Sequence, residues 1–107
     1  MLLKKNRADK KAVKKIFKEG KFLNSPSLTF KFIKFGDNKK QVSIIIPKSV
    51  AKFSVKRNFL RRLGYSVLKK HLNLFPSGLI GVFIFKKQEK NFLTLENEIK
   101  TIFNKIN

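Results

Sequence analysis

The spacing of apolar residues predicts a helix near the start of the chain. Four of them recur at intervals of three and four and fall on one helix face: Ala12, Val13, Ile16 and Phe17. Asp9 is a candidate N-terminal cap, and Gly20 is a natural end point. The other side of this helix is rich in Lys.

Two strands are predicted next. The segment Leu28 to Phe35 alternates apolar residues with Thr29 and Lys31, and a period of two is typical of a strand with one buried face. The run Val42 to Ile46 predicts a second strand, which Pro47 ends. Because turn-forming residues occupy positions 36–38, we expect the two strands to pair as a hairpin.

The period changes to helical between Pro47 and Pro76, with Ser54 as a candidate cap. Gly64 interrupts this pattern, so it marks either close packing or a boundary between two short helices. The run "LIGVFIF" at 79–85 is apolar on both faces, which predicts a central, buried strand.

A final helix is predicted from about Thr94. Its apolar stripe comprises Leu95, Ile99, Ile102, Phe103 and Ile106. The predicted order is therefore helix, two or three strands, basic helix, strand, helix, which is an α/β (α+β) arrangement. We see no repeat or linker, so we expect residues 1–107 to form a single domain.

Charge changes this picture most. The 107 residues include 26 Lys and Arg against six Asp and Glu, a formal net charge of +20, while an apolar fraction of 42% is enough for a core. No acid occurs between Asp37 and Glu89, although that interval holds twelve Lys and Arg. Binding a polyanion would relieve this self-repulsion, so we expect a nucleic-acid partner.

Several other classes are disfavoured. No apolar run approaches the ~20 residues of a membrane-spanning helix, and the opening "MLLKKNR" lacks the features of a secretory signal. We therefore expect a cytoplasmic protein without a membrane partner. The chain has no Cys, which excludes disulfides and zinc fingers.

The middle helix carries the main candidate site. Projected at ~100° per residue, one side holds Val55, Phe59, Leu60, Leu63 and Val67. The opposite side, with Arg57 at its border, holds Asn58, Arg61, Arg62, Tyr65 and Lys69. This spacing suits contacts with successive phosphates, although any solvated helix shows a charged face. The lack of acids on the helix favours the nucleic-acid interpretation.

The segment "KSVAKFSVKRNFLRR" resembles the signature segment of the protein subunit of bacterial ribonuclease P. In that family a basic helix opens with Arg-Asn-Arg. Arg57, Asn58, Arg61 and Arg62 match the family pattern, whereas Phe59 stands where the third motif residue is normally Arg. The stretch "KKNRADKKAVKKIFKEG" is similar to the family's first helix, and the resemblance covers about residues 4–87.

This resemblance implies a two-layer sandwich like the RNA-binding domains of ribosomal proteins, with a mixed sheet. The basic helix would lie in a left-handed crossover between parallel strands, an exception to a rule that holds in ~98% of cases. The implied function is to bind the catalytic RNA subunit, which removes the 5′ leader of precursor tRNA with Mg²⁺ held mainly by RNA and substrate. The protein itself would hold no catalytic residue and no metal, and would need no obligate protein partner.

The resemblance implies two sets of RNA-contacting residues. The set for the RNA subunit comprises Lys48, Lys52, Lys56, Arg57, Asn58, Arg61, Arg62, Tyr65 and Lys69. The set for the single-stranded leader, in a cleft between the first helix and the sheet, comprises Phe17, Val13 and Lys31. Phe17 can stack on an unpaired base, but it can equally be a core residue. Phe30 would replace Lys31 if the strand register differs by one.

Three alternatives compete with this function. A self-sufficient nuclease needs clustered carboxylates or an acid–base pair, yet the acids are scattered and His71 is expected to be solvated or weakly capping. A small ribosomal or rRNA-binding protein would share the size and charge, and the motif segment argues against it. A DNA-binding protein is less favoured because no zinc site, zipper or clear helix-turn-helix is present.

Overall fold

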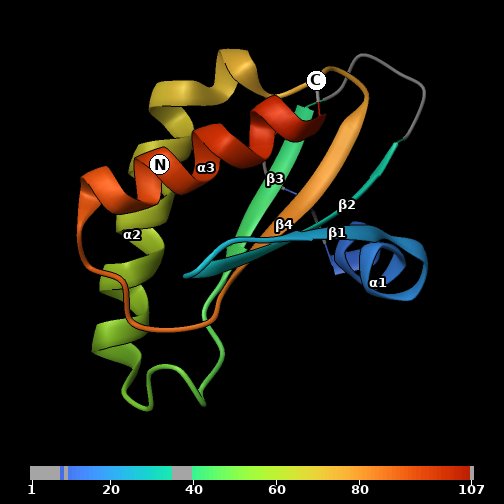
Figure 1. Cartoon of the computed structure of the whole chain (residues 1–107). Coiled ribbons are helices and arrows are strands. Elements are labelled where there is room, and N and C mark those ends of the chain that lie inside the picture. Colours follow the sequence, from blue (N-terminus) through green and yellow to red (C-terminus); the bar gives the residue numbers. More distant parts are fainter. Residues whose placement is uncertain (1–7, 9, 35–39, 107) are drawn as a thin grey trace.

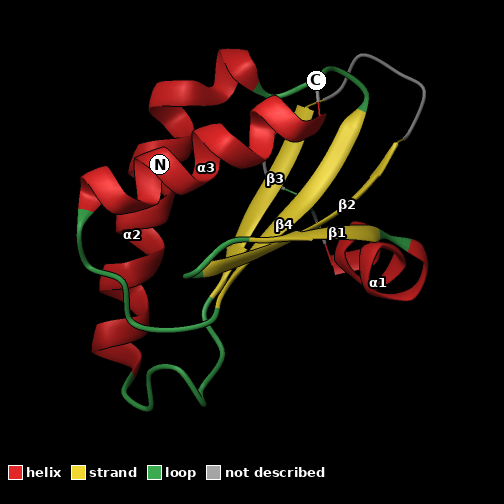
Figure 2. Ribbon diagram, in the orientation of Figure 1, coloured by secondary structure: helices red, strands yellow, loops and turns green. Residues whose placement is uncertain are grey.

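A computed structural model describes residues 8, 10–34 and 40–106 and contains one mixed sheet (Figure 1, Figure 2). Its strands are β1 (Lys21–Asn24), β2 (Leu28–Lys34), β3 (Lys40–Ile45) and β4 (Leu79–Phe85), in the spatial order β1-β2-β4-β3. β4 pairs antiparallel with β2 and parallel with β3. The α+β class, the mixed sheet and the central position of β4 are confirmed.

The predicted hairpin between Leu28–Phe35 and Val42–Ile46 is wrong. β4 lies between these strands, and β2 forms its hairpin with β1, which is too short for alternation to reveal. The reason is burial: β4 is buried along almost its whole length, so both of its edges must be paired. The turn predicted at 36–38 lies outside the described residues, as does Asp9.

Helices cover both faces of the sheet (Figure 1). α2 (Ser54–His71), the short 3-10 helix η2 (Leu72–Leu74) and α3 (Phe92–Ile106) lie on one side, and α1 (Lys10–Glu19) lies on the other. Along β4, Phe83 and Phe85 join the core beneath α2 and α3, whereas Ile80 and Val82 pack with Ile16 of α1. α2 connects the parallel strands β3 and β4, and the left-handedness of this crossover stays a prediction.

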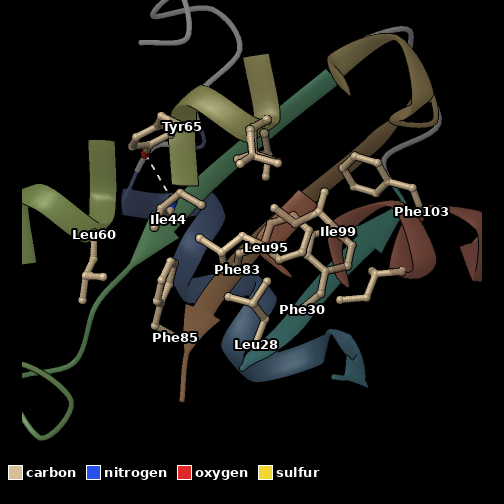
Figure 3. Packing of buried hydrophobic residues seen from close by; sticks show 14 of the residues in the cluster. Leu28, Phe30, Ile44, Leu60, Tyr65, Phe83, Phe85, Leu95, Ile99 and Phe103 are labelled. Atoms are coloured by element: carbon tan, nitrogen blue, oxygen red, sulfur yellow. Dashed lines mark hydrogen bonds between the residues drawn. The ribbon is translucent and has the colours of Figure 1, made fainter. Parts of the chain in front are cut away.

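The largest fully buried side chains of the larger core are phenylalanines (Figure 3). The Phe30 ring is fully buried and stacks on Phe83, with ring centroids 4.3 Å apart, while Phe103 meets it edge-on. Such pairs contribute about 0.5–1.5 kcal/mol beyond area burial. A Cβ atom at Gly81 would lie 2.3 Å from two Phe30 ring carbons, so this glycine leaves the room that the ring occupies.

α2 is one continuous helix that runs through Gly64. A Cβ atom at Gly64 would lie 3.0 Å from Ile44 Cδ1, so close packing against β3 explains this glycine and no helix boundary is present. Ser54 is not the cap that the sequence predicted. Phe53 occupies the N-cap position, and no side chain makes a capping hydrogen bond there.

The apolar stripe predicted on the last helix is confirmed. Leu95, Ile99, Ile102 and Phe103 are buried, and Ile106 packs at the border of the core. α3 starts at Phe92, where the Asn91 side chain accepts a hydrogen bond from the Thr94 N–H at 3.1 Å. Within the described ranges, no helix combines the length and apolar character needed to cross a bilayer.

Two buried glutamates of α3 make contacts that the sequence pattern did not reveal. Glu98 Oε1 accepts hydrogen bonds from the Ser27 N–H at 2.7 Å and from the Ser25 hydroxyl, which ties α3 to the β1–β2 turn. Glu96 Oε2 lies 2.9 Å from Lys70 Nζ and 2.8 Å from His71 Nε2. We expected His71 to be solvated or weakly capping, but it is paired with Glu96 between α2 and α3.

Acid should weaken this contact between α2 and α3. Hydrogen bonds from His71 and then Lys70 lower the pKa of Glu96 from 4.5 to about 2. The ionised carboxylate therefore stabilises the fold fully above pH 4.5, and this contribution is lost as the pH falls toward about 2. Glu96→Gln should be less stable than the wild type at neutral pH, and the difference should shrink in strong acid. Urea unfolding of both proteins at neutral pH and in strong acid measures this difference in the free energy of unfolding. A difference that does not change with pH would contradict the prediction.

Candidate nucleic-acid interface

The solvent-facing side of α2 carries basic and polar residues, but it is rotated from the side that the sequence predicts. Asn58, Arg62 and Lys69 are exposed as expected. Arg61 is half-buried and Tyr65 is buried. The cause is that α2 packs against both β3 and α3, so two neighbouring elements set its buried side.

The same rotation exposes residues that the helical projection of the sequence places on the apolar side. Val55 and Phe59 are exposed, whereas Gly64 and Leu68 are buried. The first two turns of α2 thus present large apolar side chains to solvent beside its basic residues.

Tyr65 has a structural role at the edge of the sheet. Its hydroxyl accepts a hydrogen bond from the Ile44 N–H at 3.2 Å (Figure 3). β3 is an edge strand, and outward N–H groups of such a strand have no neighbouring strand to bind. Because the residue is only 5% exposed, little of its ring is accessible to a partner.

Four of the predicted contact residues line one depression of about 270 Å³: Asn58, Arg61, Arg62 and Tyr65. Arg61 Nη1 donates a hydrogen bond to Asn58 Oδ1 at 2.8 Å, which orients the guanidinium along the helix. Two guanidinium groups beside an amide offer donors for phosphate oxygens and for base edges.

Arg57 fastens the loop that precedes α2. Its Nη1 donates to the carbonyl oxygens of Ala51 at 2.9 Å and Lys52 at 2.7 Å. Gln88 Nε2 holds the same loop through the Val50 carbonyl at 2.9 Å. Arg57 is therefore a positioning residue for the loop, a role that helical spacing does not reveal.

This loop and the first turn of α2 present three of the predicted lysines. Lys48 and Lys52 are exposed on the loop, and Lys56 is exposed on the helix. With Asn58, Arg62 and Lys69 they extend the basic area beyond α2 itself. We call these six residues together with Arg61 the α2 surface.

A second surface lies on the α1 side of the sheet. Lys31 Nζ is 4.8 Å from the centre of the Phe17 ring, so β2 presents Lys31 toward α1. Phe30 is fully buried on the opposite side, and the predicted register is thereby confirmed. Phe17 is 45% exposed and lies outside both core clusters, which decides against the core alternative. Val13, in contrast, packs against the smaller core.

Phe22 belongs to this second surface and was not predicted. It lies opposite Lys31 in the β1–β2 pairing, so the two side chains share one face of the sheet. It is 62% exposed. Its only sequence signal is a Phe in the four residues "KFLN", which are too few to show alternation. We call these residues the Phe17–Lys31–Phe22 surface.

A groove of about 360 Å³ lies where α1, β1 and β2 meet. It is lined by Lys15, Glu19, Lys21, Phe32, Ile33 and Lys34. Gly20 makes the tight junction between α1 and β1, because a Cβ atom there would collide with the Ile16 carbonyl oxygen. Three lysines on its wall make the groove suited to an anionic strand.

The carboxylates of the described residues do not fit a Mg²⁺ site. Glu96 is engaged by Lys70 and His71, and Glu98 by the serines of the β1–β2 turn. Across residues 8, 10–34 and 40–106, no three acidic or histidine side chains gather as metal ligands. Mg²⁺ takes several oxygen ligands, which this part of the chain does not bring together.

Comparisons with known proteins agree with this architecture. The family model described as Ribonuclease P matches residues 3–107. The RNase P protein from Thermotoga maritima has a similar structure, with a TM-score of 0.84 and 22% identity over 94% of this chain and 97% of that one. The Staphylococcus aureus RNase P protein gives a TM-score of 0.77 and 16% identity over 92% of this chain and 93% of that one. No curated protein matches the sequence.

The role of Arg57 in the loop can be separated from that of an exposed cation. Arg57→Ala removes two charge-assisted hydrogen bonds to carbonyls, so the free energy of unfolding should fall by roughly 1–3 kcal/mol. Arg62 lies on the exposed side of α2, so Arg62→Ala should change the free energy of unfolding by less than about 0.5 kcal/mol. Urea denaturation of both variants checks this. Equal stability of the two variants would show that the loop contacts are unimportant.

Proposed function

The chain belongs to the ribonuclease P family of bacterial tRNA-processing proteins. On this premise we propose that it binds the ribonuclease P RNA through the α2 surface. We propose further that it binds the 5′ leader of precursor tRNA through the Phe17–Lys31–Phe22 surface. The observation that carries the proposal is a run of exposed cations along α2 and its loop in a segment without a single acid. Lys and Arg in this arrangement neutralise successive phosphates.

The α2 surface suits a structured RNA. Arg61 and Arg62 can each donate two hydrogen bonds to one phosphate, and Asn58 can read a base edge beside them. The loop lysines extend the contact to phosphates further along the backbone. Because Arg57 and Gln88 hold this loop, little conformational entropy is lost when RNA binds.

The Phe17–Lys31–Phe22 surface suits a single strand. Two exposed rings can stack on unpaired bases, and Lys31 between them can bind the intervening phosphate. The neighbouring groove with its three lysines would continue the path of the strand. A mature tRNA lacks the leader, so this surface would favour the precursor.

Cleavage is assigned to the RNA subunit in this proposal. Mg²⁺ supplies the charge stabilisation that phosphodiester hydrolysis needs, and it would be held by RNA and substrate. The protein's residues bind, orient the leader and screen repulsion between two polyanions. Sequencing the RNA that co-purifies with the protein tests the partner, and a predominance of rRNA would favour a ribosomal role instead.

RNA binding should depend steeply on salt. Each phosphate contact contributes about −0.7 to −0.9 to the slope of log K against log salt. Arg62→Ala should therefore reduce the slope by about one contact, whereas Lys18→Ala, on α1 across the sheet, should leave RNA-subunit binding unchanged. Affinity for the ribonuclease P RNA measured over a salt series gives both slopes. A flat response of the wild type would rule out phosphate binding.

The protein should increase the preference of the holoenzyme for precursor over mature tRNA. Phe17→Ala and Phe22→Ala should each reduce this preference by up to the stacking energy of ~1–3 kcal/mol per base. Leu93→Ala, at an exposed apolar position of α3, is the control and should leave the ratio unchanged. Binding of both tRNAs with and without protein provides the measurement. If the protein strengthened both equally, leader recognition would be wrong.

A further inference from the structure

Three large apolar side chains are exposed within seven residues at the start of α2. Phe53 is the N-cap residue, and Val55 and Phe59 lie one helical turn apart on the same side. Their exposed fractions are 65%, 77% and 49%. A single exposed apolar residue needs no explanation, but a cluster of three within seven positions indicates a binding surface.

The surroundings of this cluster are cationic. Lys52 Nζ lies 6.0 Å from the centre of the Phe53 ring. Lys56 and Arg62 are exposed on the first turns of the same helix. Since no acid occurs between Asp37 and Glu89, the segment offers apolar and positive groups and nothing negative.

RNA with unpaired bases matches this chemistry better than a protein partner does. A protein-binding patch usually has a core that is depleted of charged residues, whereas unpaired RNA offers base faces for aromatic rings and phosphates for the cations beside them. Regular A-form RNA would not suffice, because its bases are stacked on one another and hidden from the rings.

We propose that Phe53, Val55 and Phe59 form a platform for unpaired bases in a loop or bulge of the ribonuclease P RNA, with Lys52, Lys56 and Arg62 binding the flanking phosphates. This inference rests on the proposed function and adds base stacking to the same interface. None of the three apolar residues belongs to a core cluster, so replacing them should leave the fold intact.

Tryptophan fluorescence gives a direct test, because the chain has no Trp of its own. Phe59→Trp places a single indole on the platform. Leu93→Trp places one at a 64% exposed position of α3 and is the matched control. On titration with the ribonuclease P RNA, the indole of Phe59→Trp should lose emission and become inaccessible to acrylamide, while that of Leu93→Trp should stay accessible.

Affinity and salt dependence supply a second, independent readout. Phe59→Ala should weaken RNA binding about 5- to 150-fold, the value of one stacked base. Its slope against salt should equal that of the wild type, because no phosphate contact is lost. Thermal melting of Phe59→Ala should match the wild type.

The outcomes separate this inference from the proposed function. If RNA binds with a steep salt slope but the indole of Phe59→Trp stays accessible, the platform is wrong and the proposed function stands. If that indole becomes protected without RNA as protein concentration rises, the cluster is a contact between copies of the chain and the platform is again wrong. If the wild type does not bind the RNA at all, the proposed function fails with it.

Discussion

Complete burial of β4 is the constraint on which the rest of the structure depends. Its side chains are apolar in both directions, so a helical layer must cover each face, and its backbone must be paired on both edges. Parallel pairing with β3 requires a connection that returns to the same end of the sheet, and α2 provides it. The basic helix is thus held against β3 and α3, and its polar side can face only solvent.

Within the described residues, the placement of the acids leaves most of the positive charge of that solvent-facing side without an acidic partner. Of the four acids in the described ranges, Glu96 and Glu98 are buried and bonded within the fold. Glu96 joins α3 to the end of α2, where it pairs with the exposed Lys70, and Glu98 joins α3 to the β1–β2 turn. Neither is paired with a cation of the α2 surface. A phosphate that approaches the α2 surface therefore meets cations that are not already paired with acids of the described ranges. Its attraction to them is weakened mainly by screening from dissolved salt.

Elements whose burial is complete or strictly one-sided could be predicted from the sequence. The two-sided apolar run of β4, the stripe of α3 and the alternation that directs Lys31 toward α1 each reflect a single local period. Strand order, the rotation of α2 and the roles of Tyr65 and Arg57 depend on which distant elements pack together. A helical projection identifies an apolar side but gives no weight to a glycine, so it does not show that Gly64 packs against Ile44 of β3.

In the proposed function, the two candidate surfaces lie on opposite sides of one sheet, so RNA on α2 leaves α1 accessible (Figure 1). A subunit that contacts both a catalytic RNA and its substrate needs this separation, and the sheet between the surfaces keeps their spacing constant. Positive charge attracts both polyanions and screens their mutual repulsion, but it acts equally on every phosphate. Discrimination therefore rests on the base-edge contact of Asn58 and on the exposed rings of each side, because stacking requires bases that are not already paired.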